Sequence, residues 1–378
     1  MRDTPEGLCA ELTRHIQHQV RQAGGWIGFD RFMELALYTP GLGYYAHGST
    51  KFGALPQGVV DGSGTRSGVG SDFVTAPEMT PLFGYALARQ VAQAMQATQT
   101  TELWEFGAGT GALACQLLDA LQAMGQVVSR YTILDLSDSL KARQRDTLHQ
   151  HAHRVHWAEA LPEQLQGVVV GNEVLDAMPV QLLARVQGQW RERGVACAEQ
   201  GLAWQDRPTS LRPPVAVEGS HDYLTEIHPQ GEAFVRTLAD RMSHGAIFLL
   251  DYGFPEREYF HPQRHMGTVM CHRAHQADAD PLVDVGLKDI TAHVNFTGIA
   301  LAAQDAGLEV LGYTCQAHFL MNCGIVELME QAPLAQRATA QKLLMEHEMG
   351  ELFKVIGLVK GPLFNALGFA RGDRTHRL

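Results

Sequence analysis

The segment from Glu102 to Met124 constrains the fold more than any other part of the sequence. A short apolar run at 102–106 precedes a glycine-rich turn at 107–111, and a helical pattern follows in which leucine recurs every four residues from Leu113. A strand, a glycine-rich turn and a helix in this order are typical of an α/β sheet whose backbone approaches a ligand closely.

The alternation of strands and helices continues after this segment. We expect strands at 131–136, 168–170, 246–250 and 353–359, and helices at 139–149 and 325–350. Parallel strands need crossover connections, which these helices supply. The sequence therefore predicts an α/β fold with a mostly parallel, Rossmann-like sheet.

Other patterns flank or interrupt this core. Apolar residues at four-residue spacing predict helices from Glu6 to about Tyr38, and Thr80 followed by Pro81 is typical of a capped helix start. Period-two stretches between Leu182 and Trp204 predict inserted antiparallel strands. We expect an N-terminal helical extension at residues 1–95, which includes a Gly/Ser-rich surface loop at about 55–72. The core follows at residues 96–378 and contains the insert at about 182–225.

Charge and composition exclude several classes of protein. The 378 residues carry 30 Lys plus Arg and 41 Asp plus Glu, a formal charge of -11, which argues against binding to nucleic acid or anionic membranes. No apolar run approaches the length of a membrane span, and the N-terminus has acids at Asp3, Glu6 and Glu11 and no apolar signal region. We expect a cytoplasmic protein.

Cysteine and histidine spacing predicts neither a disulfide framework nor a metal centre. The six cysteines include no C-x-x-C pair. His149 and His153 are four apart, but their polar segment offers no carboxylate partner, so we interpret it as a solvated helix end. For His261, His265, His272 and His275, a loop over the ligand cleft is a better interpretation than a metal cluster.

The glycine motif permits two cofactors. Gly107, Gly109 and Gly111 satisfy the dinucleotide pattern, and they also suit S-adenosylmethionine (SAM). Glu105 favours SAM, because its carboxylate would attract the ligand's ammonium group but repel a pyrophosphate. Asp135, at the end of the next strand, could bind ribose hydroxyls in either case.

A second acidic motif, Asn172 to Pro179, follows the buried strand 168–170. Ligands bind at the carboxyl ends of parallel strands, so this motif should lie beside the cofactor. On a helical turn, Glu173 and Asp176 would share one face and could hold a guanidinium or ammonium. The alternative is structural: Asp176 as a helix cap and Glu173 as a first-turn charge.

Taken together, the motifs resemble the MidA family, which includes a mitochondrial complex I assembly factor with arginine methyltransferase activity. The resemblance covers nearly the whole chain and is carried by Phe32–Tyr45, Asp72–Glu78, Glu105–Gly111, Asn172–Pro179 and Asp289–Phe296. It implies a class I SAM-dependent methyltransferase fold. For the mitochondrial relatives it implies symmetric dimethylation of arginine on a complex I subunit, so a protein substrate is expected.

The resemblance also assigns residues. It gives Glu105, Gly107, Gly109, Gly111, Asp135 and Asn172 to the cofactor and Glu173, with Asp176 second, to orientation of the substrate nitrogen. It places Thr75, Pro77, Glu78 and His293 along the same cleft.

The chain departs from the family pattern at two places. It has Asn295 where the family usually has Asp, and its segment 55–72 is longer than the family's glycine-rich link. Two other functions stay open: a methyltransferase-like assembly chaperone without catalysis, and a nicotinamide-dependent oxidoreductase.

Overall fold

The computed structural model describes residues 4–46, 59–60, 66–67, 75–135, 138–199, 201–273 and 276–378. Contacts between residues divide the chain into two compact units whose segments alternate along the sequence. Unit 1 comprises Met1–Ser49, Leu175–Glu232 and Phe254–Gly298, and unit 2 comprises Thr50–Val174, Ala233–Gly253 and Ile299–Leu378. The predicted loop at 55–72 lies outside the described residues, except for the short antiparallel strands β2 (Val59–Val60) and β3 (Arg66–Ser67).

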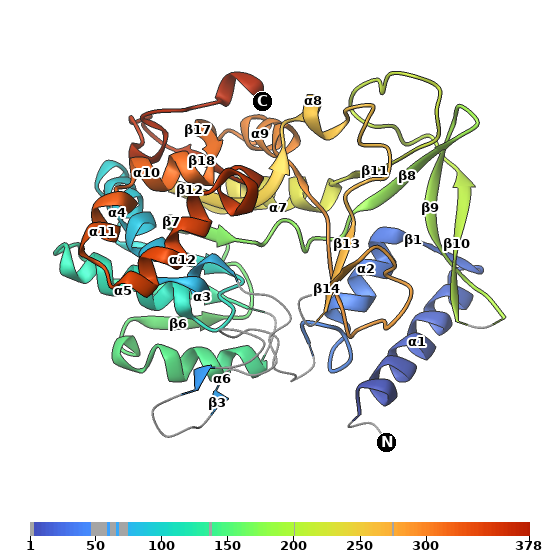
Figure 1. Ribbon diagram of the computed structural model, residues 1–378, viewed down its shortest axis with the longest axis horizontal. Coiled ribbons are helices and arrows are strands. Elements are labelled where there is room, and N and C mark those ends of the chain that lie inside the picture. Colours follow the sequence, from blue (N-terminus) through green and yellow to red (C-terminus); the bar gives the residue numbers. More distant parts are fainter. Residues whose placement is uncertain are drawn as a thin grey trace. The chain divides into compact units, whose positions relative to one another are not determined.

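A mostly parallel sheet forms the centre of unit 2 (Figure 1). Its order is β17-β18-β12-β7-β4-β5-β6, and the neighbours from β12 to β6 are parallel, whereas β18 is antiparallel to both β12 and β17. The strands are β4 (Glu102–Phe106), β5 (Arg130–Leu134), β6 (Val155–Ala158), β7 (Leu165–Asn172), β12 (Met242–Phe254), β17 (Glu309–Cys315) and β18 (Phe353–Lys360). The predicted α/β fold class is confirmed.

Helices cover this sheet because their apolar faces need burial. Contacts join α4 to α5, α11 and α12, which lie together on one side of the sheet (Figure 1). Phe234 of α7 packs edge-on against Phe106 of β4, with ring centres 5.1 Å apart. The helices with residues in unit 2 are α3 (Ala76–Met79), α4 (Pro81–Thr98), α5 (Ala112–Ala123), α6 (Asp138–Thr147), α7 (Pro229–Arg241), α9 (Phe296–Asp305), α10 (Gln316–Asn322), α11 (Ile325–Gln331) and α12 (Leu334–Leu344), with short helical turns η1 (His149–His151), η2 (Glu346–Gly350), η3 (Leu367–Phe369) and η4 (Thr375–Arg377).

The start of α4 follows the predicted capping pattern. Thr80 Oγ1 accepts a hydrogen bond from Leu82 N over 3.4 Å, and Pro81 is the first helical residue. The boundary predicted at residue 95, between the N-terminal helical extension and the core, stays a prediction. By contacts, α4 lies with α5 in unit 2.

The predicted helix over 325–350 is wrong. The structure has α11, α12 and the π-helical turn η2 instead. Ala332 has an extended ψ of 156° because the following Pro333 disfavours the helical conformation before it and offers no N–H to continue the ladder.

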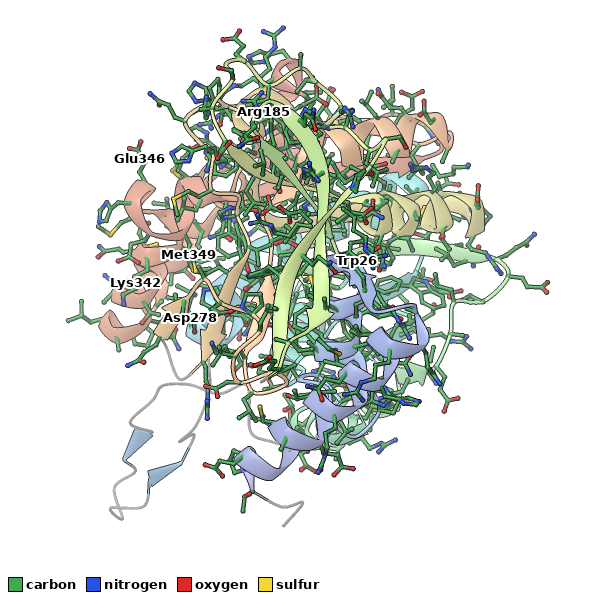
Figure 2. The ribbon with its side chains drawn as sticks, turned by 90° about the vertical axis from the view of Figure 1, so that its right-hand side faces the viewer. Trp26, Arg185, Asp278, Lys342, Glu346 and Met349 are labelled. Carbon is green, nitrogen blue, oxygen red and sulfur yellow. The ribbon has the colours of Figure 1, made fainter. Side chains whose placement is uncertain are left out.

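Unit 1 contains an antiparallel sheet with the order β1-β9-β8-β11. A fifth strand, β10, pairs antiparallel with residues 191–197 of β9. The hairpins of this sheet turn at Gln187–Gly188 and at Gly201, where φ is positive, so the predicted antiparallel insert is confirmed. Figure 2 shows Trp26 and Arg185 on strands of this sheet. Its strands are β1 (Trp26–Gly28), β8 (Gln181–Val186), β9 (Gln189–Cys197), β10 (Leu202–Pro208) and β11 (Tyr223–Ile227).

The helices of unit 1 bury the apolar stripe that the sequence predicts. Leu12, Ile16 and Val20 of α1 (Pro5–Gln22) are fully buried, and α2 (Phe29–Tyr38) contacts β8 and β9. Unit 1 also contains a small sheet of order β14-β13-β15, formed by β13 (Met270–Arg273), β14 (Gln276–Asp278) and β15 (Asp289–Thr291). The helix α8 (Glu256–Tyr259) precedes this sheet in the sequence, and β16 (Val294–Asn295) follows it.

Two further sequence expectations bear on the molecule's environment. All six cysteines are free thiols. Among the described residues, we find no helix with both the length and the apolar character that crossing a membrane would require.

Candidate functional site

The glycine turn between β4 and α5 has the backbone of a ligand-binding loop. Gly107, Gly109 and Gly111 have φ values of 64°, 54° and 86°, a region that residues with a Cβ rarely adopt. Gly111 is the N-cap of α5 and has no side chain to bond the first helical N–H groups, which leaves them suited to an incoming acceptor. The N–H of Gly107 donates to the Leu134 carbonyl over 3.1 Å and so ties the turn to the end of β5.

Glu105 lies inside the sheet next to this turn and is 2% exposed. Tyr131 Oη donates to Glu105 Oε2 over 2.7 Å. Burial raises the pKa of Glu105 to about 8; the Tyr131 hydrogen bond lowers the pKa, and the nearby negative charge of Asp135 raises it. A cation brought close to this carboxyl would favour its ionised form.

Asp135 is held by Gln144, which was not among the predicted site residues. The amide nitrogen of Gln144, on α6, donates to Asp135 Oδ2 over 2.8 Å and to the Gly109 carbonyl over 3.0 Å. Trp157 Nε1 donates to Gln144 Oε1 over 2.8 Å, and Gln144 is fully buried. Gln144 therefore fixes the acidic end of β5 relative to the glycine turn.

The predicted cleft residues of segment 75–78 also lie in unit 2. Thr75 is the N-cap residue of α3. Gln116 Nε2 on α5 donates to the Pro77 carbonyl over 2.7 Å, and Thr110 Oγ1, in the glycine turn, donates to Glu78 Oε1. The structure thus brings Glu78 to the glycine turn, although its role toward a substrate stays a prediction.

The end of β7 carries Asn172 and Glu173, and here the local expectation is wrong. Residues 173–176 do not form a helical turn, since Glu173 has a φ of 54°. The Glu173 N–H donates to the Leu250 carbonyl over 2.9 Å, and the Val174 N–H donates to Asp251 Oδ2 over 3.2 Å. Asp251 is 1% exposed and was not among the predicted site residues.

This stretch also shows how the side chain of Glu173 is held. Asn172 Nδ2 donates to Glu173 Oε1 over 3.0 Å. The contacts that anchor Glu173 and Val174 come from the end of β12, far away in the sequence. The chain passes from unit 2 into unit 1 after Val174.

Asp176 belongs to a group of buried acids and tyrosines in unit 1. It is 4% exposed, and Asp289 is 3% exposed. Tyr38 Oη donates to the Ala177 carbonyl and Tyr45 Oη donates to Asp289 Oδ1, each over 2.8 Å. Burial, Asp289 and Asp176 all raise the pKa of both tyrosines, so the hydroxyls stay protonated at neutral pH.

His293 lies in a second buried network of unit 1. The backbone N–H of His293 donates to Thr268 Oγ1 over 3.0 Å, and the Thr268 hydroxyl in turn donates to Glu226 Oε2 over 3.1 Å. Tyr259 Oη also donates to this carboxylate over 3.0 Å and lies 3.3 Å from His228 Nε2. Burial lowers the pKa of His228 to about 4, so its ring is neutral at physiological pH.

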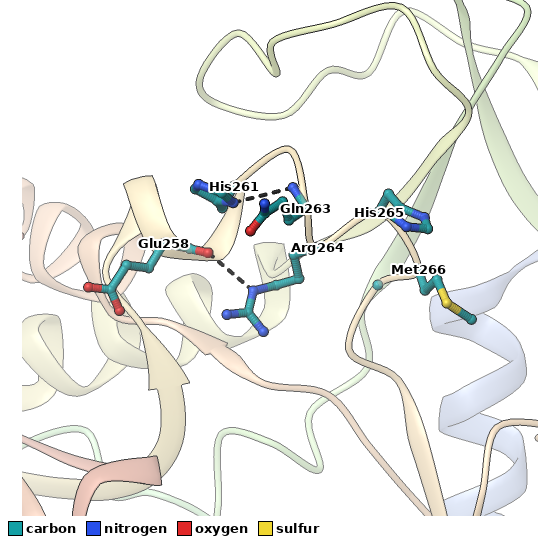
Figure 3. Close-up of a pocket in the computed structure, with 7 residues that line it drawn as sticks. Glu258, His261, Gln263, Arg264, His265 and Met266 are labelled. Carbon is teal, nitrogen blue, oxygen red and sulfur yellow. Dashed lines mark hydrogen bonds between the residues drawn. The ribbon is translucent and has the colours of Figure 1, made fainter.

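A surface pocket of about 420 Å³ opens beside this network in unit 1 (Figure 3). Glu258, His261 and residues 263–267 line it. Arg264 Nε donates to the Glu258 carbonyl over 3.1 Å, and its guanidinium carbon lies 3.9 Å from the Phe254 ring centre. Two of the histidines expected in a loop therefore line a pocket, whereas His272 lies in β13 and His275 is outside the described residues.

Asn295 has a structural role at the start of α9. Its Oδ1 accepts a hydrogen bond from Gly298 N over 3.4 Å at the start of α9. Asn and Asp are about equally good in this capping position.

The strand ends of unit 2 fit SAM better than a dinucleotide. Asn172 Oδ1 is buried and has no hydrogen-bond partner among the described residues, so it can accept a bond from a ligand. The buried acid at Glu105 suits the ammonium of an amino-acid tail, because a nearby cation would favour its ionised form, and it offers no positive charge to a pyrophosphate. A doubly wound sheet with this turn and these acids defines a class I SAM-dependent methyltransferase.

Comparison with known proteins agrees with this class. The sequence profile of a family described as "Putative S-adenosyl-L-methionine-dependent methyltransferase" matches residues 86–314. The chain belongs to this family and is a SAM-dependent methyltransferase of the MidA type, which confirms the resemblance.

Relatives match over most of the chain. The "Protein arginine methyltransferase NDUFAF7, mitochondrial" of Danio rerio is 24% identical over 354 residues, which cover 84% of this chain and 78% of that protein. The human protein of the same name is 23% identical over 407 residues, covering 94% and 84%. A crystal structure from Burkholderia thailandensis, bound to S-adenosyl-homocysteine, is 46% identical with a TM-score of 0.92 and covers 99% of this chain and 98% of that one.

Proposed function

We propose that this chain transfers the methyl group of SAM to a guanidinium nitrogen of arginine in a protein. The observation that carries the proposal is the acid at the end of β7: Glu173, held by Asn172 and anchored through its backbone to β12. A carboxylate is the group that pairs best with a guanidinium, often through two parallel hydrogen bonds. The names of the curated relatives support the same acceptor.

The residues of unit 2 divide the work of binding. The glycine turn offers backbone to the cofactor, Asp135 offers two oxygens to ribose hydroxyls, and Glu105 becomes the counter-charge of the ammonium. Gln144 keeps Asp135 and Gly109 in place before the ligand arrives. Binding therefore needs little rearrangement of these groups.

When bound, SAM supplies a methyl group on a sulfonium, which makes the methyl carbon electrophilic. The nitrogen forms the new bond as the sulfur–carbon bond breaks, and the product nitrogen then loses a proton to solvent. In this scheme Glu173 orients the nitrogen and stabilises the positive charge that develops on the acceptor. No strong base is needed if the proton leaves after the methyl group has moved.

We further infer, from the family resemblance, that the acceptor is a subunit of a complex I type respiratory enzyme. The test is mass spectrometry of arginine-containing peptides from cells with and without this gene. We expect specific methylarginine peptides to disappear without the gene and to return with the wild-type chain but not with Gly109→Val. Identical methylarginine peptides in the cells with and without the gene would overturn the proposal.

A further inference from the structure

Three different metal-binding side chains from α5 and η1 form a cluster, and none of them is among the residues assigned to the cofactor. The cluster consists of Cys115 and Asp119 on α5 and His151 in η1. One donor atom from each of the three residues lies within 4.8 Å of the other two. His151 Nε2 is 2.8 Å from Asp119 Oδ1, and Cys115 Sγ is 3.8 Å from Asp119 Oδ2.

The fold brings these side chains together from distant parts of unit 2. Residues 115 and 119 are four apart, so they lie on the same face of α5, opposite the buried leucines. The backbone of η1 is fixed by hydrogen bonds from His151 N to the Leu148 carbonyl and from Arg154 N to the His151 carbonyl, both 2.9 Å. The sequence could not show the pairing, because the carboxylate lies 32 residues before the histidine.

Burial makes the histidine a fixed ligand and leaves the other two adjustable. His151 is 5% exposed, whereas the side chain of Asp119 is 46% exposed. His151 Nδ1 is buried and has no hydrogen-bond partner among the described residues. The nitrogen that faces the cluster is Nε2, next to Asp119, and the half-exposed Asp119 side chain gives an ion access from solvent.

The donor types select the ion. A thiolate, an imidazole and a carboxylate together suit Zn²⁺, whereas Mg²⁺ and Ca²⁺ prefer oxygen ligands alone. Around a tetrahedral Zn²⁺, donor atoms are roughly 3 to 4 Å apart, which follows from bond lengths of about 2.0–2.3 Å. The observed spacings need only small side-chain shifts to reach this geometry.

We propose that Cys115, Asp119 and His151 form a zinc site with a fourth position open to water. The ion joins α5, which begins at the glycine turn, to η1, which follows α6 and its Gln144. Its role is to stabilise unit 2, and it takes no part in methyl transfer. The site is independent of the proposed arginine acceptor.

The experiment uses the full chain without a histidine tag, stripped of metal with a chelator. Zn²⁺ binding is measured by calorimetry, and Co²⁺ binding by absorbance, where a thiolate ligand gives a charge-transfer band in the near ultraviolet. The test variants are Cys115→Ser and Asp119→Asn. Matched controls are Cys197→Ser, a partly buried cysteine of unit 1, and His153→Gln, from the same histidine-rich segment.

We expect one equivalent of Zn²⁺ in the wild type and both controls, and an affinity lower by at least about tenfold in both test variants. The thiolate band should be absent from Cys115→Ser alone among the cysteine variants. Circular dichroism of each variant establishes that it is folded. Absence of zinc binding in the wild type, or equal binding and an unchanged cobalt band in Cys115→Ser, would overturn the proposal.

Discussion

The substitution Glu105→Gln tests the electrostatics of the cofactor site. Glutamine has the same shape and can still accept the Tyr131 hydrogen bond, but it cannot ionise. In the wild type, the pKa of Glu105 is about 8 in the folded state, against 4.5 for an unperturbed glutamate. Between these values the folded state holds one proton more than the unfolded state, so the free energy of unfolding falls as the pH rises.

The size of this effect follows from proton linkage. One proton changes the free energy of unfolding by about 1.4 kcal/mol per pH unit, so between pH 5 and pH 7 the wild type should lose roughly 2 to 3 kcal/mol through Glu105. Glu105→Gln lacks this loss. Its stability relative to the wild type should therefore increase by that amount over the same range.

Urea denaturation at pH 5, 6 and 7, followed by circular dichroism, measures the difference. Glu102→Gln is a matched control, because Glu102 is in the same strand and only partly buried. Its unfolding should follow the wild-type pH dependence. If the free energy of unfolding changes with pH in the same way in the wild type and in Glu105→Gln, Glu105 does not have a raised pKa and is not a buried, mostly protonated acid.

The ionisation of Glu105 should couple SAM binding to the release of a proton. At pH 7, a pKa of about 8 leaves Glu105 about nine-tenths protonated, and an arriving ammonium favours ionisation. SAM binding at pH 7 should therefore release close to one proton from this residue. Calorimetry in buffers with different ionisation enthalpies counts the protons, and the release should be lower by nearly one in Glu105→Gln.

Three other substitutions probe separate parts of the site. Gly109→Val should abolish SAM binding, because Gly109 lies in the turn assigned to the cofactor and its φ of 54° disfavours a residue with a Cβ. Gly201→Val carries the same kind of backbone strain, with φ of 84°, in a hairpin of unit 1 and should bind SAM normally; equal SAM affinity in both by calorimetry would contradict this. Glu173→Gln should bind SAM like the wild type and lose transfer to a verified substrate, and full activity would exclude its proposed role. Gln144→Leu should weaken SAM binding by about ten- to a hundredfold, because it removes the hydrogen bonds that Gln144 donates to Asp135 and to the Gly109 carbonyl. Unchanged affinity would show that these two hydrogen bonds are unimportant for SAM binding.

The sequence predicts the parts of this fold that depend on local patterns. Leucine spacing after the glycine turn gave α5, Thr80 and Pro81 gave the start of α4, and alternation around Gly188 gave a hairpin. These features follow from periodicity and backbone preference within about twenty residues. The single helix predicted at 325–350 is wrong because Pro333 interrupts the helical hydrogen bonds, although the apolar pattern continues on both sides of it.

Contacts between distant segments could not be predicted. Glu173 is held by Leu250, whose position beside β7 depends on the register of two parallel strands. Gln144 looks like an ordinary polar helix residue in the sequence, and only the fold shows that it is fully buried between Asp135 and Gly109. The roles of the site residues stay predictions, as does the cytoplasmic location.

The most direct test of the central claim is label transfer in vitro. The purified chain is incubated with SAM labelled in its methyl group and with proteins from cells that lack the gene, and the labelled amino acids are identified after hydrolysis. We predict label in methylated arginine with the wild type, and none with Gly109→Val or Glu173→Gln. Label confined to another amino acid, or equal labelling by the wild type and Gly109→Val, would contradict the account.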